Sequence, residues 1–479
     1  MRPYIIIRYI GLVLLLCSGF MFVSLLISIY NSDTGQIPLL LSCIVTALIG
    51  IFPMVFVPPS AHVTHKESYV IVVLSWLLVC FFGMLPYLMW GGEFRVVNAW
   101  FESVSGFTTT GATILNDIEA LPNGLLFWRS STHWLGGFGV ILFVLIVIPA
   151  LGKTRMSLSK LEMSQLSKSN FKYRTNKTLR ILLTVYIALT ITQTTLLYFF
   201  GMSLFDAINH TFSTVATAGF SPKNESIGHY NCVAIEVTTT IFMFIAGIHF
   251  GILFLIFTFK KSKWYNSSVL RYYFVAIIIG IGLITLNVWG EHFETWQESL
   301  RYASFQVVAI STTTGFHTAD TAIWPSFSIL ILIYFMFQSA CAGSTVGSMK
   351  VDRLVIFFKS LKRQILRLQH PNAIIPVRVD GQPVDNETVD SVLLFIVLFV
   401  LILFLNGAAL AAMGVDLTTA FSASAATITT VGPGFGEVGS DLNYANIPSL
   451  GKVLLTFNML LGRLEIFGLM LLFFMKSWK

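Results

Sequence analysis

Four short segments of the chain place hydroxyl or other small side chains just before a glycine, and threonine stands two positions before the glycine in each. Glycine reaches backbone angles that turn carbonyl oxygens inward, and it lets chains approach without a Cβ atom. Carbonyl oxygens around one point can replace the hydration shell of a cation. The segments therefore predict a cation site built mainly from backbone. Its candidate residues are Thr109, Thr110 and Gly111; Thr217, Ala218 and Gly219; Thr313, Thr314 and Gly315; and Thr430, Val431 and Gly432.

The segments form an internal repeat, because their glycines are separated by 108, 96 and 117 residues. A single threonine-rich match could be chance, but four in the same context favour a repeat. In each repeat a short half-polar helix would point its C-terminal end, with about half a negative charge, toward the centre. Four such helices around one axis would form a pore, and a dehydrated potassium ion fits this geometry best.

The composition indicates that these helices lie in a membrane. Of 479 residues, 55% are hydrophobic and 11% are charged, whereas soluble domains average about 25% charged residues. A soluble enzyme of this length could not cover its surface with so few charges. The net charge of +7 could suggest nucleic acid or anionic lipid as a partner, but its distribution among the loops is that of a membrane protein.

Ten apolar runs approach or exceed the length of about 20 residues that a bilayer-crossing helix needs. They lie near residues 9–30, 36–57, 69–90, 124–151, 181–203, 231–259, 268–290, 325–349, 389–413 and 449–475. Four shorter half-polar segments lie between them, near 97–110, 204–218, 297–314 and 417–431. Segments of this length and polarity are more often re-entrant than spanning.

Lysine and arginine gather in the loops 152–180 and 350–388 and in the loop after the sixth run, whereas the alternate loops are acidic. Positive loops mark the cytoplasmic side. All basic loops fall on that side only if the half-polar segments re-enter without crossing. We therefore expect a multi-pass protein of the cytoplasmic (inner) membrane with both termini cytoplasmic.

The predicted fold is an all-α integral membrane protein. Two N-terminal transmembrane helices would occupy residues 1–57, and four helix–re-entrant pore loop–helix repeats around a central pore would occupy 68–151, 180–259, 268–358 and 389–476. Glycines 25 to 30 residues past each segment predict that the second helix of every repeat breaks at a similar depth. They are Gly136 and Gly137, Gly247, Gly343, and Gly462.

The chain resembles the Trk/Ktr superfamily of potassium transporters, and within it the ten-span TrkH type, over nearly its whole length. The resemblance rests on the four glycine loops and on the motifs at 127–137, 341–345, 432–436 and 461–465. It implies potassium uptake across the cytoplasmic membrane through a selective, channel-like pore. It also implies a homodimer and a cytosolic TrkA-like regulatory subunit that binds a nucleotide, NAD or ATP.

The first and second loops bear on selectivity. In the family that the chain resembles, serine in place of the first filter glycine is associated with the passage of sodium. The presence of Gly111 in this chain therefore favours potassium. Ala216 and Ala218 in the second loop depart from the hydroxyl pattern of the family. Because carbonyl oxygens would make the filter, we expect this departure to cost little selectivity.

Small and hydroxyl residues interrupt the eighth run from Ser339 to Ser348. They could simply allow close helix packing. The resemblance implies instead a loop that obstructs the pore below the filter. The candidate gate residues are Ala342, Gly343, Ser344, Thr345, Val346, Gly347 and Arg463.

Two arginines lie in or beside apolar runs, where a charge is costly and usually faces the interior. Arg463 could pair with Glu465 or with a backbone carbonyl, and the resemblance implies that it stands in the permeation path near the gate. Arg129 could pair with a carboxylate such as Glu102, which would be a structural role.

The sequence shows no catalytic set of recognisable spacing, so we do not expect an enzyme. Residues 434–439 match G-x-G-x-x-G, but they neither follow a predicted strand nor open a helix. We expect no cofactor in this chain, K⁺ as the transported ion, and membrane lipid but no nucleic acid as a partner. Two alternatives stay open: a symporter that couples potassium to a proton or sodium ion, and a sodium-permeable relative.

Overall fold

The computed structural model describes residues 2–58, 64–150, 175–257 and 267–466. The described chain is almost entirely helical, apart from a small antiparallel pair, β1 (Arg378–Val379) and β2 (Gln382–Pro383). The N-terminal helices are α1 (Pro3–Asn31) and α2 (Gln36–Phe56). The four repeats contain α3 (His65–Gly83), α4 (Leu85–Trp90), α5 (Val96–Phe107) and α6 (Asn123–Ala150); α9 (Thr175–Phe199), α10 (Leu204–Val215), α11 (Val233–Ala246) and α12 (Phe250–Phe257); α13 (Ser268–Val288), α14 (Trp296–Ser311), α15 (Ser326–Phe337) and α16 (Val351–Gln369); and α17 (Asn386–Ala412), α18 (Leu417–Ile428) and α19 (Ser449–Arg463).

Helices stand at all ten predicted apolar runs, which confirms the all-α membrane fold. Among the described residues, six helices are long and apolar enough to cross a bilayer, and the bent pair α11–α12 would be a seventh. Helices α15 and α19 are shorter than their predicted runs because the chain leaves the helix after Phe337 and after Arg463. These two helix ends border the candidate gate.

The predicted break in the second helix of each repeat is present in three repeats. The axes of α11 and α12 differ by 110° across the break at residues 247–249, α15 ends before Gly343, and α19 ends next to Gly462. The prediction is wrong for the first repeat, because α6 runs unbroken through Gly136 and Gly137. A glycine inside a helix costs only about 1 kcal/mol, and at Gly136 the missing Cβ lets α6 pass close to the carbonyl of Phe107.

Four short helices, α5, α10, α14 and α18, are the predicted re-entrant segments. They have 12 to 16 residues, which is too short to cross a bilayer. Three of them begin at a side-chain cap, in which Ser203, Thr295 or Asp416 accepts a hydrogen bond from a backbone N–H of the first turn. Such caps satisfy N–H groups that would otherwise have no partner. We call these four elements the pore helices.

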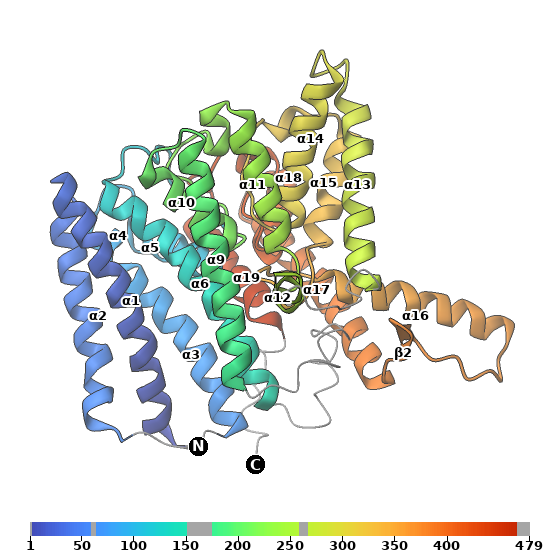
Figure 1. The fold of residues 1–479 in the computed structure, drawn as a ribbon, viewed down its shortest axis with the longest axis horizontal. Helices are drawn as coiled ribbons and strands as arrows, with labels where there is room; N and C mark the ends of the chain where they lie inside the picture. Colours follow the sequence, from blue (N-terminus) through green and yellow to red (C-terminus); the bar gives the residue numbers. More distant parts are fainter. Residues whose placement is uncertain (1, 59–63, 151–174, 258–266, 467–479) are drawn as a thin grey trace.

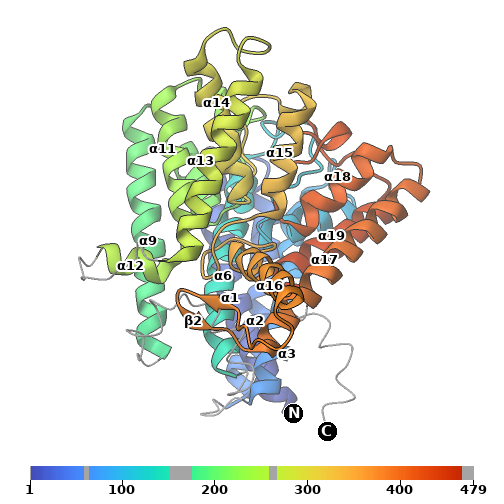
Figure 2. The ribbon, with the colours of Figure 1, turned by 90° about the vertical axis from the view of Figure 1, so that its right-hand side faces the viewer.

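Within the four repeats, the longer helices surround the pore helices. The N-terminal pair, α1 and α2, lies outside the repeats. Figure 1 shows α1 and α2 together at one flank, and they pack on each other, with α1 also against α3 and α6. Figure 2 shows α9, α11 and α13 on one side and α17 to α19 on the other. One apolar core is formed by α1, α3, α5 and α6 together with α18 and α19. A second core includes side chains from every helix between α9 and α15. The ends of the pore helices contribute to both cores, Phe107 to the first and Val215 and Ile310 to the second.

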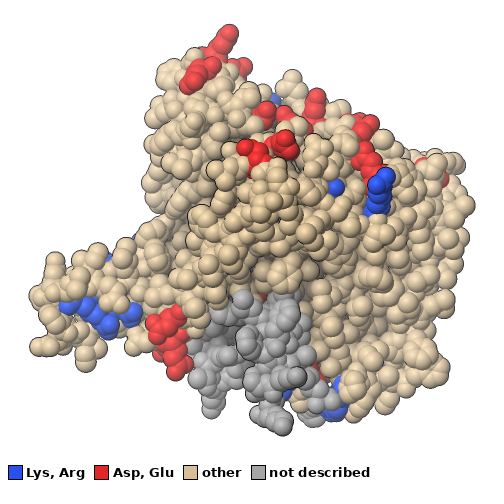
Figure 3. Space-filling model, turned by 180° about the vertical axis from the view of Figure 1, so that it is seen from behind, with Lys and Arg blue, Asp and Glu red and all other residues tan. Residues whose placement is uncertain are grey.

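Acidic and basic side chains are distributed unequally between the two ends of the molecule. Figure 3 shows mainly acidic side chains along the end at which the α13–α14 loop lies, with a few basic ones among them, and a group of basic side chains on the arm formed by α16, with an acidic group beside it. This unequal distribution agrees with the alternation of basic and acidic loops in the sequence.

Candidate functional site

Each pore helix is followed, two residues on, by a threonine with left-handed backbone. Thr109, Thr217, Thr313 and Thr430 have φ values of 54°, 53°, 54° and 54°. Helix ends in this conformation usually use glycine, and another residue there stores about 1–3 kcal/mol of strain. The same strained angle in all four repeats marks this position as part of a site.

The residue after each threonine completes the cap of its pore helix. Its backbone N–H donates to the carbonyl five residues earlier, in a Schellman arrangement. The four bonds are Thr110 N to Ser105 O at 2.9 Å, Ala218 N to Ser213 O at 2.8 Å, Thr314 N to Ala309 O at 2.8 Å and Val431 N to Ala426 O at 2.9 Å. These four hydrogen bonds use the N–H groups of the residues after the threonines. The carbonyl oxygens of the same loops take no part in the caps. We call residues 109–111, 217–219, 313–315 and 430–432 the filter loops.

The glycines of the filter loops form a closed ring in which each lies against the next loop. A Cβ atom placed on any of them would approach backbone of the following loop to less than 3.0 Å. The nearest atoms are Gly219 N for Gly111, Thr314 O for Gly219, Val431 O for Gly315 and Thr110 O for Gly432. Only glycine permits this approach, and three of these nearest atoms are carbonyl oxygens of filter loops.

The threonine hydroxyls add possible ligands to this ring. The Oγ1 atoms of Thr109, Thr313 and Thr430 are buried and form no hydrogen bond with any described residue. The fourth hydroxyl, of Thr217, donates to the carbonyl of Ala216 at 2.7 Å. Buried hydroxyls normally have partners, so three of them beside a ring of carbonyls fit a site for a partly dehydrated cation.

A cavity of about 100 Å³ opens beyond the glycine ring, and all four filter glycines line it. Tyr444 closes one side: its hydroxyl donates to the carbonyl of Gly432 at 2.7 Å, and its backbone N–H donates to Thr113 O at 2.8 Å. Asp441 also lines this cavity, with Oδ1 3.2 Å from Nε2 of His317. The ring therefore opens toward polar loops at this end. A larger apolar groove of about 620 Å³ between α13 and α15 shares none of these residues.

The irregular segment 338–350, which we call the gate loop, lies directly against the filter loops. Thr345 Oγ1 is 3.2 Å from Thr217 Oγ1 and donates to Val215 O at 3.1 Å. A Cβ on Gly347 would overlap the hydroxyl of Thr430. The structure thus brings the predicted gate residues together with the threonine side of the filter, opposite the outer cavity.

The break between α11 and α12 holds the gate loop. Cys341 N donates to Gly247 O at 3.1 Å, and Phe250 N donates to Gly343 O at 3.1 Å. Gly343 has a φ of 79°, and a Cβ there would overlap the ring of His249. The bent helix and the gate loop therefore fit each other through backbone.

Asp352, in the first turn of α16, also anchors the gate loop, and the sequence reasoning missed it. Its Oδ2 accepts the N–H of Ala342 at 2.8 Å, and its side chain is buried. Burial raises the pKa of the Asp352 carboxyl to about 6, although the hydrogen bond from Ala342 opposes that rise.

Asp352→Asn should abolish a pH dependence of stability. Because the folded-state pKa of Asp352 lies above its ordinary value, the folded chain binds this proton more tightly, and stability increases as pH falls from about 7 to about 4. The slope is at most about 1.4 kcal/mol per pH unit. Apparent melting temperatures of parent and variant in detergent between pH 7 and pH 5 would measure it. A constant difference between the two chains across this range would contradict the assignment.

Arg463 fixes the gate loop to two helices. Its Nη1 donates to Thr345 O at 2.6 Å, and its Nη2 donates to Gly136 O at 3.0 Å. Of the two structural partners considered from sequence, the backbone carbonyls are correct. Glu465 instead pairs with Lys350 at 2.8 Å and Arg353 at 2.6 Å.

Polar contacts hold the pore helices both within and between repeats. Within the first repeat, Arg129 pairs with Glu102 at 2.9 Å, as the sequence suggested. Between neighbouring repeats, Arg301 pairs with Glu236 at 2.5 Å, and Lys452 donates to Asn98 Oδ1 at 2.8 Å. The contacts between repeats join segments far apart in the chain, and the sequence gave no local signal for them.

Comparisons with known proteins agree with this geometry. The TrkH family model, described as a cation transport protein, matches residues 43–479. The Trk system potassium uptake protein TrkH of Halomonas elongata is 34% identical over 481 residues, with 99% of each chain covered. The protein of the same name from Salmonella typhimurium is 34% identical over 479 residues, again with 99% of each covered. The crystal structure of the potassium transporter TrkH from Vibrio parahaemolyticus matches with a TM-score of 0.90 at 33% identity, over 98% of each chain.

Proposed function

Because this chain belongs to the TrkH family of cation transport proteins, we propose that it takes up potassium ions through the ring of filter loops. The observation that carries the proposal is the closed ring of four glycines, each against the backbone of the next loop. Carbonyl oxygens at that ring and the free hydroxyls of Thr109, Thr313 and Thr430 would replace water around the ion. Potassium is also the ion in the names of the relatives.

The ion would enter from the acidic end of the molecule and leave past the gate loop. Acidic side chains at the entrance raise the local concentration of cations. The C-terminal ends of the four pore helices carry partial negative charge toward the ring. Below the filter loops, Thr345, Gly347 and Arg463 would block the path, so transport would require the gate loop to move.

The gate loop would be moved by a cytosolic partner. We place both termini and α16 on the cytoplasmic side of the inner membrane, because the basic loops lie there. The name Trk system of the relatives implies more than one component. A TrkA-like subunit that binds NAD or ATP would act on a homodimer of this chain. The chain itself would perform no chemical reaction on its substrate.

Cation flux into liposomes that contain only this chain tests the proposal. A potassium gradient would drive the flux, and potassium, rubidium, sodium and lithium would be compared at equal concentrations. Rubidium and potassium should pass well ahead of sodium and lithium without a proton gradient. Equal passage of sodium would contradict a potassium filter. Flux that requires an imposed proton or sodium gradient would favour the symporter.

A further inference from the structure

In each repeat, a polar side chain of the pore helix forms a hydrogen bond with the chain just beyond the filter loop. We call these hydrogen bonds the ties behind the filter. Nine residues before the filter glycine, Glu102 accepts from Ile114 N at 3.1 Å, His210 Nε2 lies 3.0 Å from Ser221 Oγ, and Gln306 donates to Ala319 O at 3.2 Å. The fourth repeat has alanine there, and the preceding Ser422 instead bonds both backbone groups of Phe435, at 2.7 and 3.0 Å. The chain beyond every filter glycine is thus held to the helix that precedes it.

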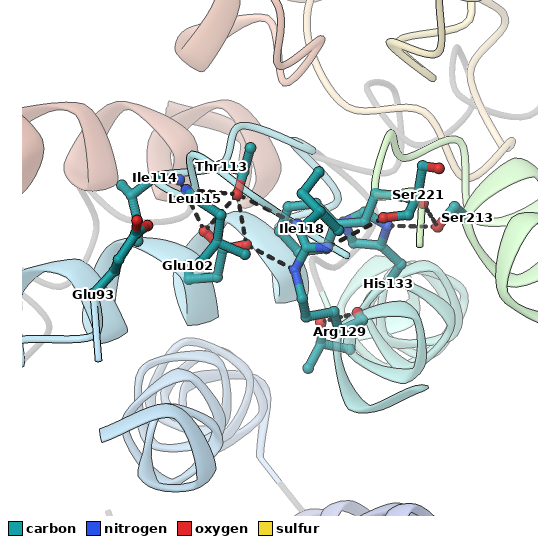
Figure 4. A network of polar contacts seen from close by, with 12 residues as sticks. Glu93, Glu102, Thr113, Ile114, Leu115, Ile118, Arg129, His133, Ser213 and Ser221 are labelled. Atoms are coloured by element: carbon teal, nitrogen blue, oxygen red, sulfur yellow. Dashed lines mark hydrogen bonds and ion pairs between the residues drawn. The ribbon is translucent and has the colours of Figure 1, made fainter. Parts of the chain in front are cut away.

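The tie in the first repeat differs from the other three because its acceptor is a buried carboxylate with a buried cation. Glu102 is 0% exposed and Arg129 is 1% exposed. The carboxylate accepts from Thr113 Oγ1 at 3.0 Å and from Arg129 Nε at 2.9 Å. Figure 4 shows Glu102 and Thr113 side by side, with Arg129 reaching them from α6.

Arg129 also contacts the chain just beyond the second filter loop. Its Nη1 donates to the carbonyl of Ser221 at 3.2 Å, and its guanidinium lies 4.0 Å from the centre of the Phe220 ring. His133, one helical turn further along α6, also stacks on Phe220, with ring centres 4.1 Å apart. One arginine therefore joins the chain beyond Gly111 to the chain beyond Gly219.

The position of Arg129 gives its charge a direct effect on the ion path. Arg129 lines the cavity that opens onto the four filter glycines. A buried guanidinium whose carboxylate has been removed is an uncompensated charge, and at this place it would repel an entering cation. With Glu102 ionised, the pair is neutral and leaves the attraction of the pore helices unopposed.

We propose that Glu102 and Arg129 form a neutral clamp that sets the spacing of the first and second filter loops and so contributes to ion selectivity. Both are positioning residues: they hold loop backbone and are not ligands of the ion. The inference rests on the proposed potassium pore.

The test compares Glu102→Gln, Arg129→Lys and the double variant Glu102→Gln/Arg129→Gln in reconstituted liposomes. Glu102→Gln should lower the potassium-to-sodium flux ratio about tenfold and raise the rubidium concentration for half-maximal flux, since Arg129 stays charged. The double variant should regain the parental half-saturation but keep the low ratio, because the charge is gone and the clamp is still absent. Arg129→Lys keeps the charge balance and should fall between Glu102→Gln and the parent in ratio.

Glu236→Gln is the matched control, because Glu236 pairs with Arg301 between α11 and α14 and does not line the outer cavity. It should lower the melting temperature and leave both the ratio and the half-saturation at parental values. Parental ratio and half-saturation in Glu102→Gln, with a selective parent, would overturn the clamp. A double variant with half-saturation no better than Glu102→Gln would overturn the charge argument. A parent that does not prefer potassium would overturn the proposed function instead.

Discussion

Gly111→Ser is expected to lower the potassium-to-sodium flux ratio about tenfold or more. Gly111 has a φ of 78°, and its Cβ would stand 2.7 Å from the backbone N of Gly219. The left-handed backbone costs a serine about 1–2 kcal/mol, and the contact can be relieved only by moving one loop away from the other. The ring then widens on one side, where carbonyl oxygens no longer match a dehydrated potassium ion. Flux ratios in liposomes measure the effect.

Gly91→Ser separates backbone strain from the contact between loops. Gly91 has a similar φ of 85°, but a Cβ there would meet nothing within 4 Å. This control should show a lower melting temperature and parental selectivity. If Gly111→Ser also keeps the parental ratio, the first loop is not part of the filter.

The filter loops could be predicted because their signal is local and repeated. Threonine two residues before glycine occurs in all four, and the structure gives that threonine the same left-handed angle each time. The backbone of the glycines could not be predicted in the same way. Gly111, Gly315 and Gly432 have positive φ, but Gly219 does not, so equal sequence positions differ in conformation.

Glycine alone also could not tell a helix break from a close helix contact. The break at Gly247 accommodates the gate loop, whereas Gly136 lies in a continuous helix against the carbonyl of Phe107. Both glycines stand at a similar distance from a filter loop. What differs is the neighbouring chain, and that information is not local in sequence.

Contacts across the pore were the least predictable part of the site. Thr345 and Thr217 are 128 residues apart, and Arg463 and Thr345 are 118 residues apart. The pair of Arg129 and Glu102 was predictable because a buried charge needs a partner. The other ties behind the filter also had a signal, since polar side chains stand nine residues before the glycine in three repeats.

Arg463→Gln is expected to raise potassium flux in the absence of any regulatory partner, about tenfold or more. Two unit charges about 8 Å apart at an effective dielectric constant of about 20 repel by about 2 kcal/mol, so removing the charge lowers a barrier below the filter. The same change removes the hydrogen bonds to Thr345 O and Gly136 O, which hold the gate loop against its neighbouring helices. Rubidium uptake by liposomes without partner protein measures basal flux.

Arg463→Lys separates the two causes, because lysine keeps the charge but cannot form both bonds of the guanidinium fork. A small rise in flux for lysine and a large one for glutamine would assign the barrier to charge; equal rises would assign it to the held loop. Lys452→Gln is the control, since Lys452 is another buried cation on α19, bonded to Asn98 and Ala445. It should destabilise the fold without opening the path.

Shortening residues 342–347 removes the loop itself and should raise basal flux even where Arg463 remains. Unchanged flux in both the shortened chain and Arg463→Gln would place the gate elsewhere.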